Sequence, residues 1–379
     1  MEKRKKVIIL YSTAGLGHKK AAVAIGRAFE EKAATIDVEL VDFNDYANRL
    51  YKFLYMDFYV FMMTRAKWLW AVLYYVSNFP LFDTLTRSLR EALDYRSFLN
   101  LAKWLKEKDP DVILATHFLL SSMAKNLRED KKIRAKMYVL VTDYGPHSYW
   151  LSDHIDKFFV GAEFVTKEFK KRHVPEDKII VTGIATSKEF HEKLDPETLR
   201  QRYGIDKNKR TIFLMSGGFG VGPLVSILSL LDLCKADIQV ITVCGYNKAI
   251  YEKVNAFKAR LKYPVISFGF TDKVAELMTI SDLMITKAGG ISVTEALNTN
   301  LPMIFYGSIP GQETWNEMFL LSNHAAVKAE RMKEIPGLVD EVLLDMDKYD
   351  QLKENIGRVR KPFAAEVIVN MIERELSNT

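Results

Sequence analysis

The feature that most constrains this fold is a regular alternation of short β-branched runs with longer helical stretches. Strands buried on both faces of a parallel sheet read as continuous apolar runs, and parallel neighbours need a crossover helix between them. A first series of such runs lies at Val7–Tyr11, Asp37–Val41, Val112–Thr116, Met137–Thr142, Lys157–Val160 and Ile179–Thr182. A second series lies at Thr211–Met215, Ile238–Val243, Val265–Phe268, Leu283–Thr286 and Pro302–Phe305. The sequence therefore predicts an α/β protein built from two doubly wound units.

The length of the chain agrees with two units. A chain of 379 residues exceeds what one hydrophobic core normally supports. The polar stretch 185–208 contains Pro196 and many charges, and it lies just before the second series of strands. We therefore expect an N-terminal domain over 1–190 and a second domain over 191–360. A helix over 361–379 is expected to pack back on the first domain.

The positive charge of the chain is concentrated in its first half. Residues 1–190 hold 31 Lys and Arg against 24 Asp and Glu, whereas residues 191–379 hold 23 against 24. On charge alone, this excess is compatible with an anionic membrane, a phosphorylated substrate, nucleic acid or a plain solvated surface. The two cysteines, Cys234 and Cys244, lie in apolar surroundings, which favours buried free thiols in a reducing cytoplasm.

A segment from 46 to 104 interrupts the alternation and is rich in aromatic residues. It carries 16 of the 44 aromatics of the chain in 59 positions. Within it, residues 68–82 are uncharged for 15 positions, fewer than the roughly 20 that a spanning helix needs, and Pro80 interrupts the run. The run contains Trp68 and Trp70, and Arg65 and Lys67 precede it. This pattern suits a helix lying in the headgroup layer of a membrane, and ordinary core packing of large aromatics is the alternative.

Glycine-rich turns follow the first strand of each unit. The sequence Ser12-Thr13-Ala14-Gly15-Leu16-Gly17-His18 lies between the first strand and a helix, so its backbone can approach a ligand closely. By itself this is also compatible with a tight turn. His18 lies at the carboxyl edge of a parallel sheet, where open α/β folds bind ligands, and it is a candidate general base.

The second unit repeats this arrangement twice. Ser216-Gly217-Gly218-Phe219-Gly220 and Thr286-Lys287-Ala288-Gly289-Gly290-Ile291-Ser292 each follow a strand and precede a helix. Such turns can bind a diphosphate, and Glu295 on the second helix can bind ribose hydroxyls. The run Pro310-Gly311-Gln312-Glu313 places an amide beside a carboxylate, which suits vicinal sugar hydroxyls.

These motifs together resemble a known family. The residues at 281–290, with Glu295, Leu301-Pro302, Pro310-Gly311-Gln312-Glu313 and Asn316, resemble the donor-site signature of glycosyltransferase family 28. The residues at 15–22 and 141–144, with His147 and Trp150, resemble its monogalactosyldiacylglycerol synthase branch, which includes processive diacylglycerol glucosyltransferases. The resemblance extends over nearly the whole chain.

The resemblance implies a GT-B fold with two Rossmann-like domains facing a cleft, and inverting transfer of a hexose from UDP-glucose or UDP-galactose to diacylglycerol or glycosyl-diacylglycerol. It also implies the roles of individual residues. His18 would be the catalytic base, with Asp143 or His147 near the acceptor. The donor would be bound by Gly218, Phe270, Lys287, Gly289, Gly290, Ser292, Glu295, Gln312, Glu313 and Asn316, with Phe270 at the uracil.

The resemblance further implies that neither a catalytic metal nor a cofactor is required and that no nucleic acid is bound. Asp345-Met346-Asp347 has the form of a metal motif, but it lies far from the glycine turns in the sequence. We expect a peripheral enzyme on the cytoplasmic face of an anionic membrane, contacting it through Arg65, Lys67, Trp68 and Trp70. The alternatives are an enzyme like UDP-N-acetylglucosamine 2-epimerase and a non-catalytic UDP-sugar-binding subunit of a membrane complex.

Overall fold

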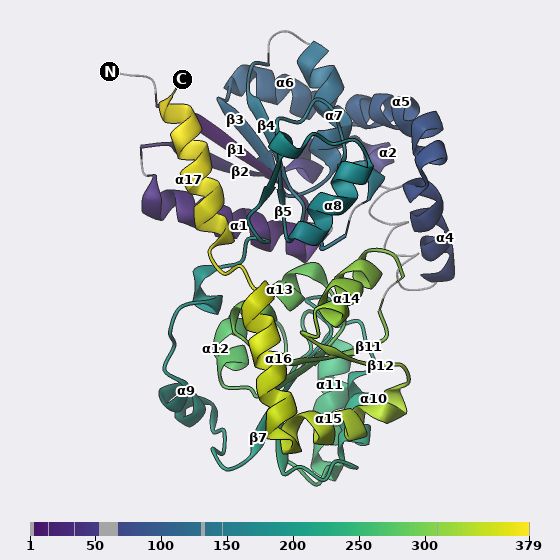
Figure 1. Cartoon of the computed structure of the whole chain (residues 1–379), viewed down its shortest axis with the longest axis vertical. Coiled ribbons are helices and arrows are strands. Elements are labelled where there is room, and N and C mark those ends of the chain that lie inside the picture. Colours follow the sequence, from purple (N-terminus) through teal and green to yellow (C-terminus); the bar gives the residue numbers. More distant parts are fainter. Residues whose placement is uncertain are drawn as a thin grey trace. The chain divides into compact units, whose positions relative to one another are not determined.

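The chain divides into two compact units, each described here by itself. The first combines Met1–Ser187 with Pro310–Trp315 and Phe363–Thr379, and the second combines Lys188–Ile309 with Asn316–Pro362. The structure is a computed structural model, and it describes residues 4–13, 15–33, 35–52, 67–129, 133–145, 147–308 and 310–378 (Figure 1).

The first unit is built on a parallel six-stranded sheet with the order β2-β1-β3-β4-β5-β6. Its strands are β1 (Lys6–Tyr11), β2 (Asp37–Asp42), β3 (Val112–Ala115), β4 (Lys136–Leu140), β5 (Lys157–Val160) and β6 (Ile179–Val181). The chain passes from β1 to β2 on one side and then to β3 on the other side of β1. The order of the strands therefore reverses between β1 and β3, and the carboxyl edge at such a point is where open α/β sheets bind ligands.

Helices join these strands, as crossover connections between parallel strands require, and a C-terminal helix also belongs to this unit (Figure 1). They are α1 (Leu16–Lys32), α2 (Arg49–Tyr51), α4 (Lys67–Asn78), α5 (Pro80–Ser97), α6 (Leu99–Lys108), α7 (Leu119–Glu129), α8 (Glu163–Lys171) and α17 (Ala364–Ser377). A short 3₁₀ turn, η3 (Ser148–Trp150), follows β4. The last helix, α17, packs against α1.

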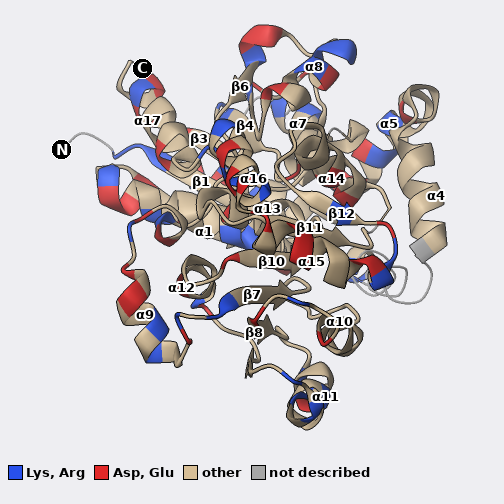
Figure 2. Ribbon diagram, turned by 60° about the horizontal axis from the view of Figure 1, so that its bottom comes forward, with Lys and Arg blue, Asp and Glu red and all other residues tan. Residues whose placement is uncertain are grey.

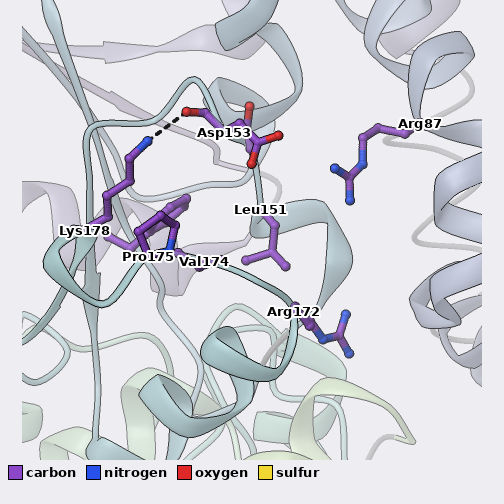
Figure 3. A pocket seen from close by; sticks show the side chains of 9 residues that line it. Arg87, Leu151, Asp153, Arg172, Val174, Pro175 and Lys178 are labelled. Atoms are coloured by element: carbon purple, nitrogen blue, oxygen red, sulfur yellow. Dashed lines mark hydrogen bonds between the residues drawn. The ribbon is translucent and has the colours of Figure 1, made fainter.

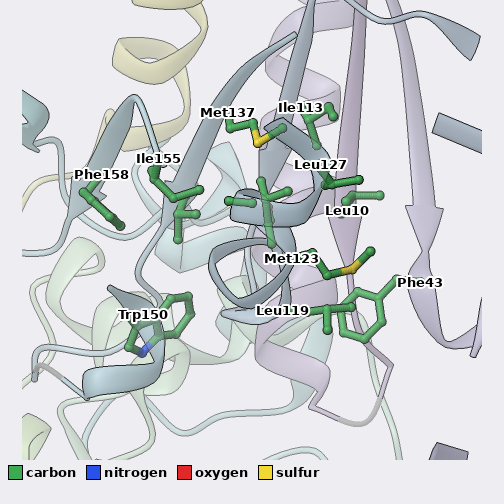
Figure 4. Packing of buried hydrophobic residues seen from close by; sticks show 14 of the residues in the cluster. Leu10, Phe43, Ile113, Leu119, Met123, Leu127, Met137, Trp150, Ile155 and Phe158 are labelled. Atoms are coloured by element: carbon green, nitrogen blue, oxygen red, sulfur yellow. The ribbon is translucent and has the colours of Figure 1, made fainter. Parts of the chain in front are cut away.

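The core of the first unit lies between the sheet and the helices on one of its faces (Figure 4). Leu10, Ile113 and Met137 project from three adjacent strands, and Leu119 and Met123 of α7 pack in the same cluster. The side chain of Trp150 closes one end of this cluster. Burial of this apolar cluster fixes the loops at the carboxyl edge of the sheet, because each loop begins where a buried strand ends.

The second unit repeats the same plan with a parallel sheet of order β12-β11-β10-β7-β8-β9. Its strands are β7 (Arg210–Met215), β8 (Ile238–Val243), β9 (Val265–Phe268), β10 (Leu283–Thr286), β11 (Met303–Tyr306) and β12 (Val327–Ala329). Here the order reverses between β7 and β10. The predicted strands are present, and the structure adds β12, which the sequence analysis did not predict because Val327-Lys328-Ala329 is not a continuous apolar run.

The helices of the second unit are α9 (Pro196–Tyr203), α10 (Leu224–Leu231), α11 (Lys248–Phe257), α12 (Val274–Thr279), α13 (Gly290–Asn298), α14 (Gln312–Ser322), α15 (Ile335–Leu344) and α16 (Met346–Val359). Several of them begin or end at a glycine or at a polar capping residue, such as Asp195 before α9 and Gly289 before α13. The first residues of α14 group with the first unit. The prediction of an α/β protein with two doubly wound units is confirmed.

Candidate active site

His18 lies in the first turn of α1, directly after the loop that follows β1. Its ring nitrogen Nδ1 is 2.6 Å from the carbonyl oxygen of Thr116, the residue that follows β3. A carbonyl oxygen only accepts, so Nδ1 carries the hydrogen and Nε2 keeps its lone pair. In the described residues no hydrogen-bond partner of Nε2 is found. The Nε2 atom of His18 can therefore accept a proton.

The surroundings of His18 keep its ring neutral. The ring of His117 lies edge-on at 4.8 Å, and the hydroxyl of Thr142 is 3.1 Å from Nδ1. Burial lowers the pKa of His18 to about 4, although its hydrogen bond to Thr116 opposes the shift. The ring is therefore neutral at pH 7, as a general base must be.

Three residues around His18 were not identified as site residues from the sequence: Thr116, His117 and Thr142. Thr116 donates its hydroxyl hydrogen to the carbonyl oxygen of His18 at 2.9 Å. Two hydrogen bonds, one in each direction, therefore join the start of α1 to the loop after β3. Each of the three lies within two residues of the end of β3 or β4. The position at the carboxyl end of a strand beside the reversal point was the signal that could have found them.

The other two residues predicted on the acceptor side, Asp143 and His147, lie in different environments. Asp143 is half-buried after β4. Its charge is close enough to Tyr74 of α4 to raise the pKa of that hydroxyl, after the larger effect of burial. Asp143 therefore remains a candidate to contact a substrate hydroxyl.

His147 is buried, and both of its ring nitrogens are used. Nδ1 accepts from the backbone N–H of Tyr149 at 3.1 Å, so Nε2 carries the hydrogen and lies 3.3 Å from the carbonyl oxygen of Tyr74. Burial lowers the pKa of His147 to about 4. These contacts anchor α4 to the η3 turn, and they favour a positioning function for His147 over chemistry.

In the second unit, the loop after β7 is held tightly against the loop after β8. Gly220 and Gly245 both have positive φ. A Cβ atom on Gly220 would lie 2.0 Å from Cys244 O, and one on Gly245 would lie 2.1 Å from Gly218 O, so neither position has room for a side chain. The backbone N–H of Tyr246 donates to Gly218 O at 3.0 Å. The hydroxyl of Ser216 is hydrogen-bonded to that of Tyr306 on β11. The loop at Gly218 is therefore already fixed in shape.

The turn after β10 leads into α13 on the other side of the reversal point. No side chain caps the N-terminus of α13 at Gly289, so its first backbone amides can face an anion. Lys287 and Ser292 are partly exposed there, and Glu295 is buried in the second turn of the helix. Asn316, predicted to bind the donor, is fully buried and donates to Ala288 O at 2.9 Å, so it holds this turn.

Phe270 is one of two exposed rings that stack on each other. Its ring lies parallel to that of Tyr246, with 4.2 Å between centroids and 13° between planes. The two residues follow β9 and β8, which are neighbours in the sheet. More than half of each side chain is exposed, so the pair offers a flat aromatic surface to a base. The family resemblance implied Phe270 at the uracil, which stays a prediction, and Tyr246 was not predicted.

Gln312 and Glu313 lie at the start of α14. They belong to the segment Pro310–Trp315, which groups with the first unit. Glu313 is buried, and the ring of Trp315 lies 5.9 Å from that of Phe164 on α8. Their assignment to the sugar hydroxyls stays a prediction.

Two family models match consecutive parts of this chain. The monogalactosyldiacylglycerol (MGDG) synthase model matches residues 18–186, and the glycosyltransferase family 28 C-terminal domain model matches residues 211–367. The chain belongs to glycosyltransferase family 28. In this family 28 chain, the first match contains His18 and Asp143, and the second contains Gly218, Phe270 and Glu295.

Curated relatives of this family 28 chain span nearly its whole length. The processive diacylglycerol beta-glucosyltransferase of Bacillus licheniformis is 27% identical, over 98% of this chain and 95% of the relative. The protein of the same name from Bacillus thuringiensis is 29% identical, over 99% of this chain and 95% of the relative. The predicted family is confirmed.

Solved structures with the same fold are more distant in sequence. MurG of Acinetobacter baumannii has a TM-score of 0.61 at 14% identity, covering 98% of this chain and 99% of MurG. The Staphylococcus aureus MnaA structure with UDP has a TM-score of 0.66 at 14% identity, covering 98% and 97%. The UDP-GlcNAc 2-epimerase of Neisseria meningitidis has a TM-score of 0.61 at 14% identity, covering 97% and 100%. These likenesses confirm the predicted GT-B type of fold.

Of the predicted membrane contacts, Trp68 is largely exposed and Trp70 is only partly exposed. The side chain of Trp68 is 72% exposed, whereas Trp70 is half-buried with its ring 6.3 Å from that of Tyr74. Arg65 and the side chain of Lys67 lie outside the described residues. Figure 2 colours the described part of α4 tan, since residues 68–78 include no Lys, Arg, Asp or Glu, whereas the ribbon of α5 has blue and red segments.

Helix α5 turns charged residues toward the protein interior and a row of leucines toward solvent. Its exposed residues include a stripe of leucines at every fourth position, the leucine face: Leu81, Leu85, Leu89 and Leu93. Its charged residues Asp83 and Glu91 are buried, and Asp83 pairs with Arg90 at 2.9 Å. Asp94 accepts from the hydroxyl of Ser122 on α7. An exposed apolar face of this kind is a candidate interaction surface.

The described residues include neither a metal-binding cluster nor a membrane-spanning helix. No group of three or more His, Cys, Asp or Glu side chains is arranged to hold a metal ion among them. The Asp345-Met346-Asp347 motif begins at the N-cap of α16, where the carboxylate of Asp345 accepts from Lys348 N at 3.1 Å. No helix of the described segments is both long and apolar enough to cross a bilayer.

Proposed function

We propose that this protein is an inverting glycosyltransferase that moves a hexose from a UDP-sugar to the free hydroxyl of diacylglycerol. The observation that carries the proposal is the hydrogen bond from His18 Nδ1 to Thr116 O, which leaves Nε2 as a base in a family 28 chain. A non-catalytic sugar-binding subunit would not need a histidine held in one tautomer.

The proposed step is a direct displacement at the anomeric carbon. The lipid hydroxyl oxygen forms the new bond to that carbon while its proton passes to His18 Nε2. The bond from the carbon to the phosphate oxygen breaks, and UDP leaves with the electron pair. Asp143 would orient the lipid hydroxyl.

The second unit would bind the leaving group. Backbone amides of the loop at Gly218 and of the N-terminus of α13 would stabilise the diphosphate as its charge develops. Their fixed shape supports this, because a preformed set of donors needs no reorganisation during the reaction. The uracil would stack on the pair formed by Tyr246 and Phe270, and Glu295 would bind the ribose hydroxyls.

The donor sugar is glucose in this proposal, because the curated relatives are named beta-glucosyltransferases. Galactose is the alternative, since the matching N-terminal family model is named for a galactolipid synthase. The acceptor is diacylglycerol, and glycosyl-diacylglycerol would serve as a second acceptor in processive transfer, as the relatives' name implies for them.

The enzyme would work as a peripheral protein on the cytoplasmic face of an anionic membrane. Trp68 and the leucine face of α5 would enter the interface, where burial of apolar surface stabilises binding. Trp68 and the four leucines of α5 are thus the proposed apolar contacts, whereas the sequence alone led us to expect Trp68 and Trp70.

The deciding experiment is a transfer assay with both labelled donors. The protein is incubated with vesicles containing diacylglycerol and with either UDP-glucose or UDP-galactose, and the lipid products are separated. Labelled monohexosyl- and dihexosyl-diacylglycerol from UDP-glucose are expected. Conversion of UDP-N-acetylglucosamine to its 2-epimer without any lipid product would instead support the epimerase alternative, and UDP binding without either product would support a non-catalytic subunit.

Neither a metal nor a cofactor enters this proposal. The charge on the leaving diphosphate would be met by backbone amides, so excess EDTA should leave transfer largely intact. Complete loss of activity that magnesium or manganese restores would contradict it.

A further inference from the structure

A second candidate binding site lies in the first unit, away from His18. It is a small pocket between Arg87 on α5 and the loops around 151–153 and 172–178 (Figure 3). Three cationic side chains line it, those of Arg87, Arg172 and Lys178, against one carboxylate, that of Asp153. Leu151 and Val174 form an apolar part of its wall.

Two of these cations have only neutral partners. Nη1 of Arg172 donates to Asn78 Oδ1 at 2.8 Å and to the hydroxyl of Ser148 at 2.9 Å. The amine of Lys178 donates to the backbone oxygens of Asp153 and Ile155, at 2.8 and 2.9 Å. Within the described segments, neither cation forms a salt bridge with a carboxylate. Both cations therefore lack a direct ion pair in the described segments, although the charges of Glu168 and Asp83 act on Arg172 at longer range.

Arg87 differs from these two because it is already paired. Its guanidinium lies 2.5 Å from the carboxylate of Asp83, which also binds Arg90. Figure 3 shows the Arg87 side chain reaching from α5 toward the pocket, opposite Arg172. An anion in the pocket would thus lie between α5 and the rest of the unit.

We propose that this pocket binds a phosphate group, as a free phosphate-bearing molecule or as the head group of a phospholipid. Guanidinium groups match the geometry of phosphate oxygens, and a lysine amine adds a point charge. Burial lowers the pKa of Arg172, so a buried anion beside it would offset part of its desolvation cost.

The pocket also has a structural consequence. Arg172 holds Asn78 at the end of α4 and Ser148 in the η3 turn, and Arg87 belongs to α5. A phosphate bound by both arginines would tie the two exposed helices to the turn that follows Asp143. Either source of phosphate would have this effect.

The test measures binding directly and does not need the transferase reaction, so failure of one proposal leaves the other standing. The protein is first saturated with UDP to block phosphate binding at the donor loops. Binding of inorganic phosphate and of dihexanoyl-phosphatidylglycerol below its micelle concentration is then followed by calorimetry, with dihexanoyl-phosphatidylcholine as the zwitterionic comparison, in which a choline cation offsets the phosphate.

Two variants and one control complete the design. Arg172→Gln and Lys178→Gln should each weaken anion binding by about 10-fold, as loss of a charge-assisted hydrogen bond implies. Lys103→Gln removes an exposed charge on α6 outside the pocket and should bind like the parent. Lys178→Gln keeps the hydrogen bonds of Arg172, so it remains informative if Arg172→Gln unfolds.

The outcomes are distinct. Weaker binding in the variants with an unchanged control supports the site. Tighter binding of the lipid than of inorganic phosphate identifies a head group as the ligand, and equal binding identifies phosphate alone. Absence of binding to the UDP-saturated parent, or equal affinity in parent and Lys178→Gln, overturns the proposal.

Discussion

The ring of His18 donates through Nδ1 to the carbonyl oxygen of Thr116 at 2.6 Å, although 98 residues separate them in the chain. The contact joins the loops after β1 and β3, at the point where the strand order of the first sheet reverses. It sets the tautomer of the imidazole and directs its lone pair away from the carbonyl.

Replacement of His18 by Ala should lower turnover by about 100-fold or more, because the lipid hydroxyl would lose its general base. UDP affinity, measured by calorimetry, should stay within about 2-fold of the parent, because the UDP-binding residues proposed here belong to the second unit. His154→Ala, at an exposed histidine of the first unit, is the matched control. Turnover within a few-fold of the parent would exclude His18 as the base and make Asp143 the next candidate.

Replacement of Tyr246 by Ala should weaken UDP binding by roughly 5- to 150-fold, since stacking on an aromatic ring contributes about 1–3 kcal/mol per base. Tyr251→Ala is the control, because Tyr251 is an exposed tyrosine of the nearby α11. Calorimetry with UDP and with uridine separates the base contribution from that of the diphosphate. Unchanged affinity for both ligands would remove Tyr246 from the site.

The double variant Leu85→Ser with Leu89→Ser should reduce co-sedimentation with anionic vesicles severalfold, because both side chains lie on the leucine face of α5. The thermal midpoint should change little, since these side chains make few contacts within the protein. Leu233→Ser, at an exposed leucine of the second unit, should sediment like the parent. Unchanged sedimentation of the double variant would mean that the leucine face does not contact the bilayer.

Stability should fall as the pH drops from about 6.5 to about 4. Burial lowers the pKa of His147 to about 4 in the folded protein, whereas an unfolded histidine titrates near 6.5. The unfolded chain therefore binds more protons in this window, and the free energy of unfolding decreases there by up to about 1.4 kcal/mol per pH unit for each such group.

The variant His147→Gln isolates this contribution. Its unfolding free energy, from urea titrations at several pH values, should depend less steeply on pH between 6.5 and 4 than that of the parent. His154→Gln, at an exposed histidine of the first unit, is the matched control variant. An identical slope in the parent and in His147→Gln would contradict the buried, neutral state of His147.

Much of the architecture was predictable because it depends on local sequence patterns. Continuous apolar runs predicted the strands, and glycines at the strand ends predicted the turns that begin α1 and α13. The same patterns placed His18 at the carboxyl edge of a parallel sheet. The spacing of two tryptophans also carried information: Trp68 and Trp70 are two residues apart on a helix, so they cannot share one face.

By itself, the sequence determined the order of strands and helices, the glycine turns and the presence of a histidine after the first strand, because each depends on neighbouring residues. The tertiary structure alone decided which nitrogen of His18 is free, since its partner is a backbone oxygen that every residue type provides. It also brought Tyr246 against Phe270 by placing β8 beside β9. For α5, the periodicity defined two faces, but only packing against α7 decided that the charged face lies inward and the leucine face outward.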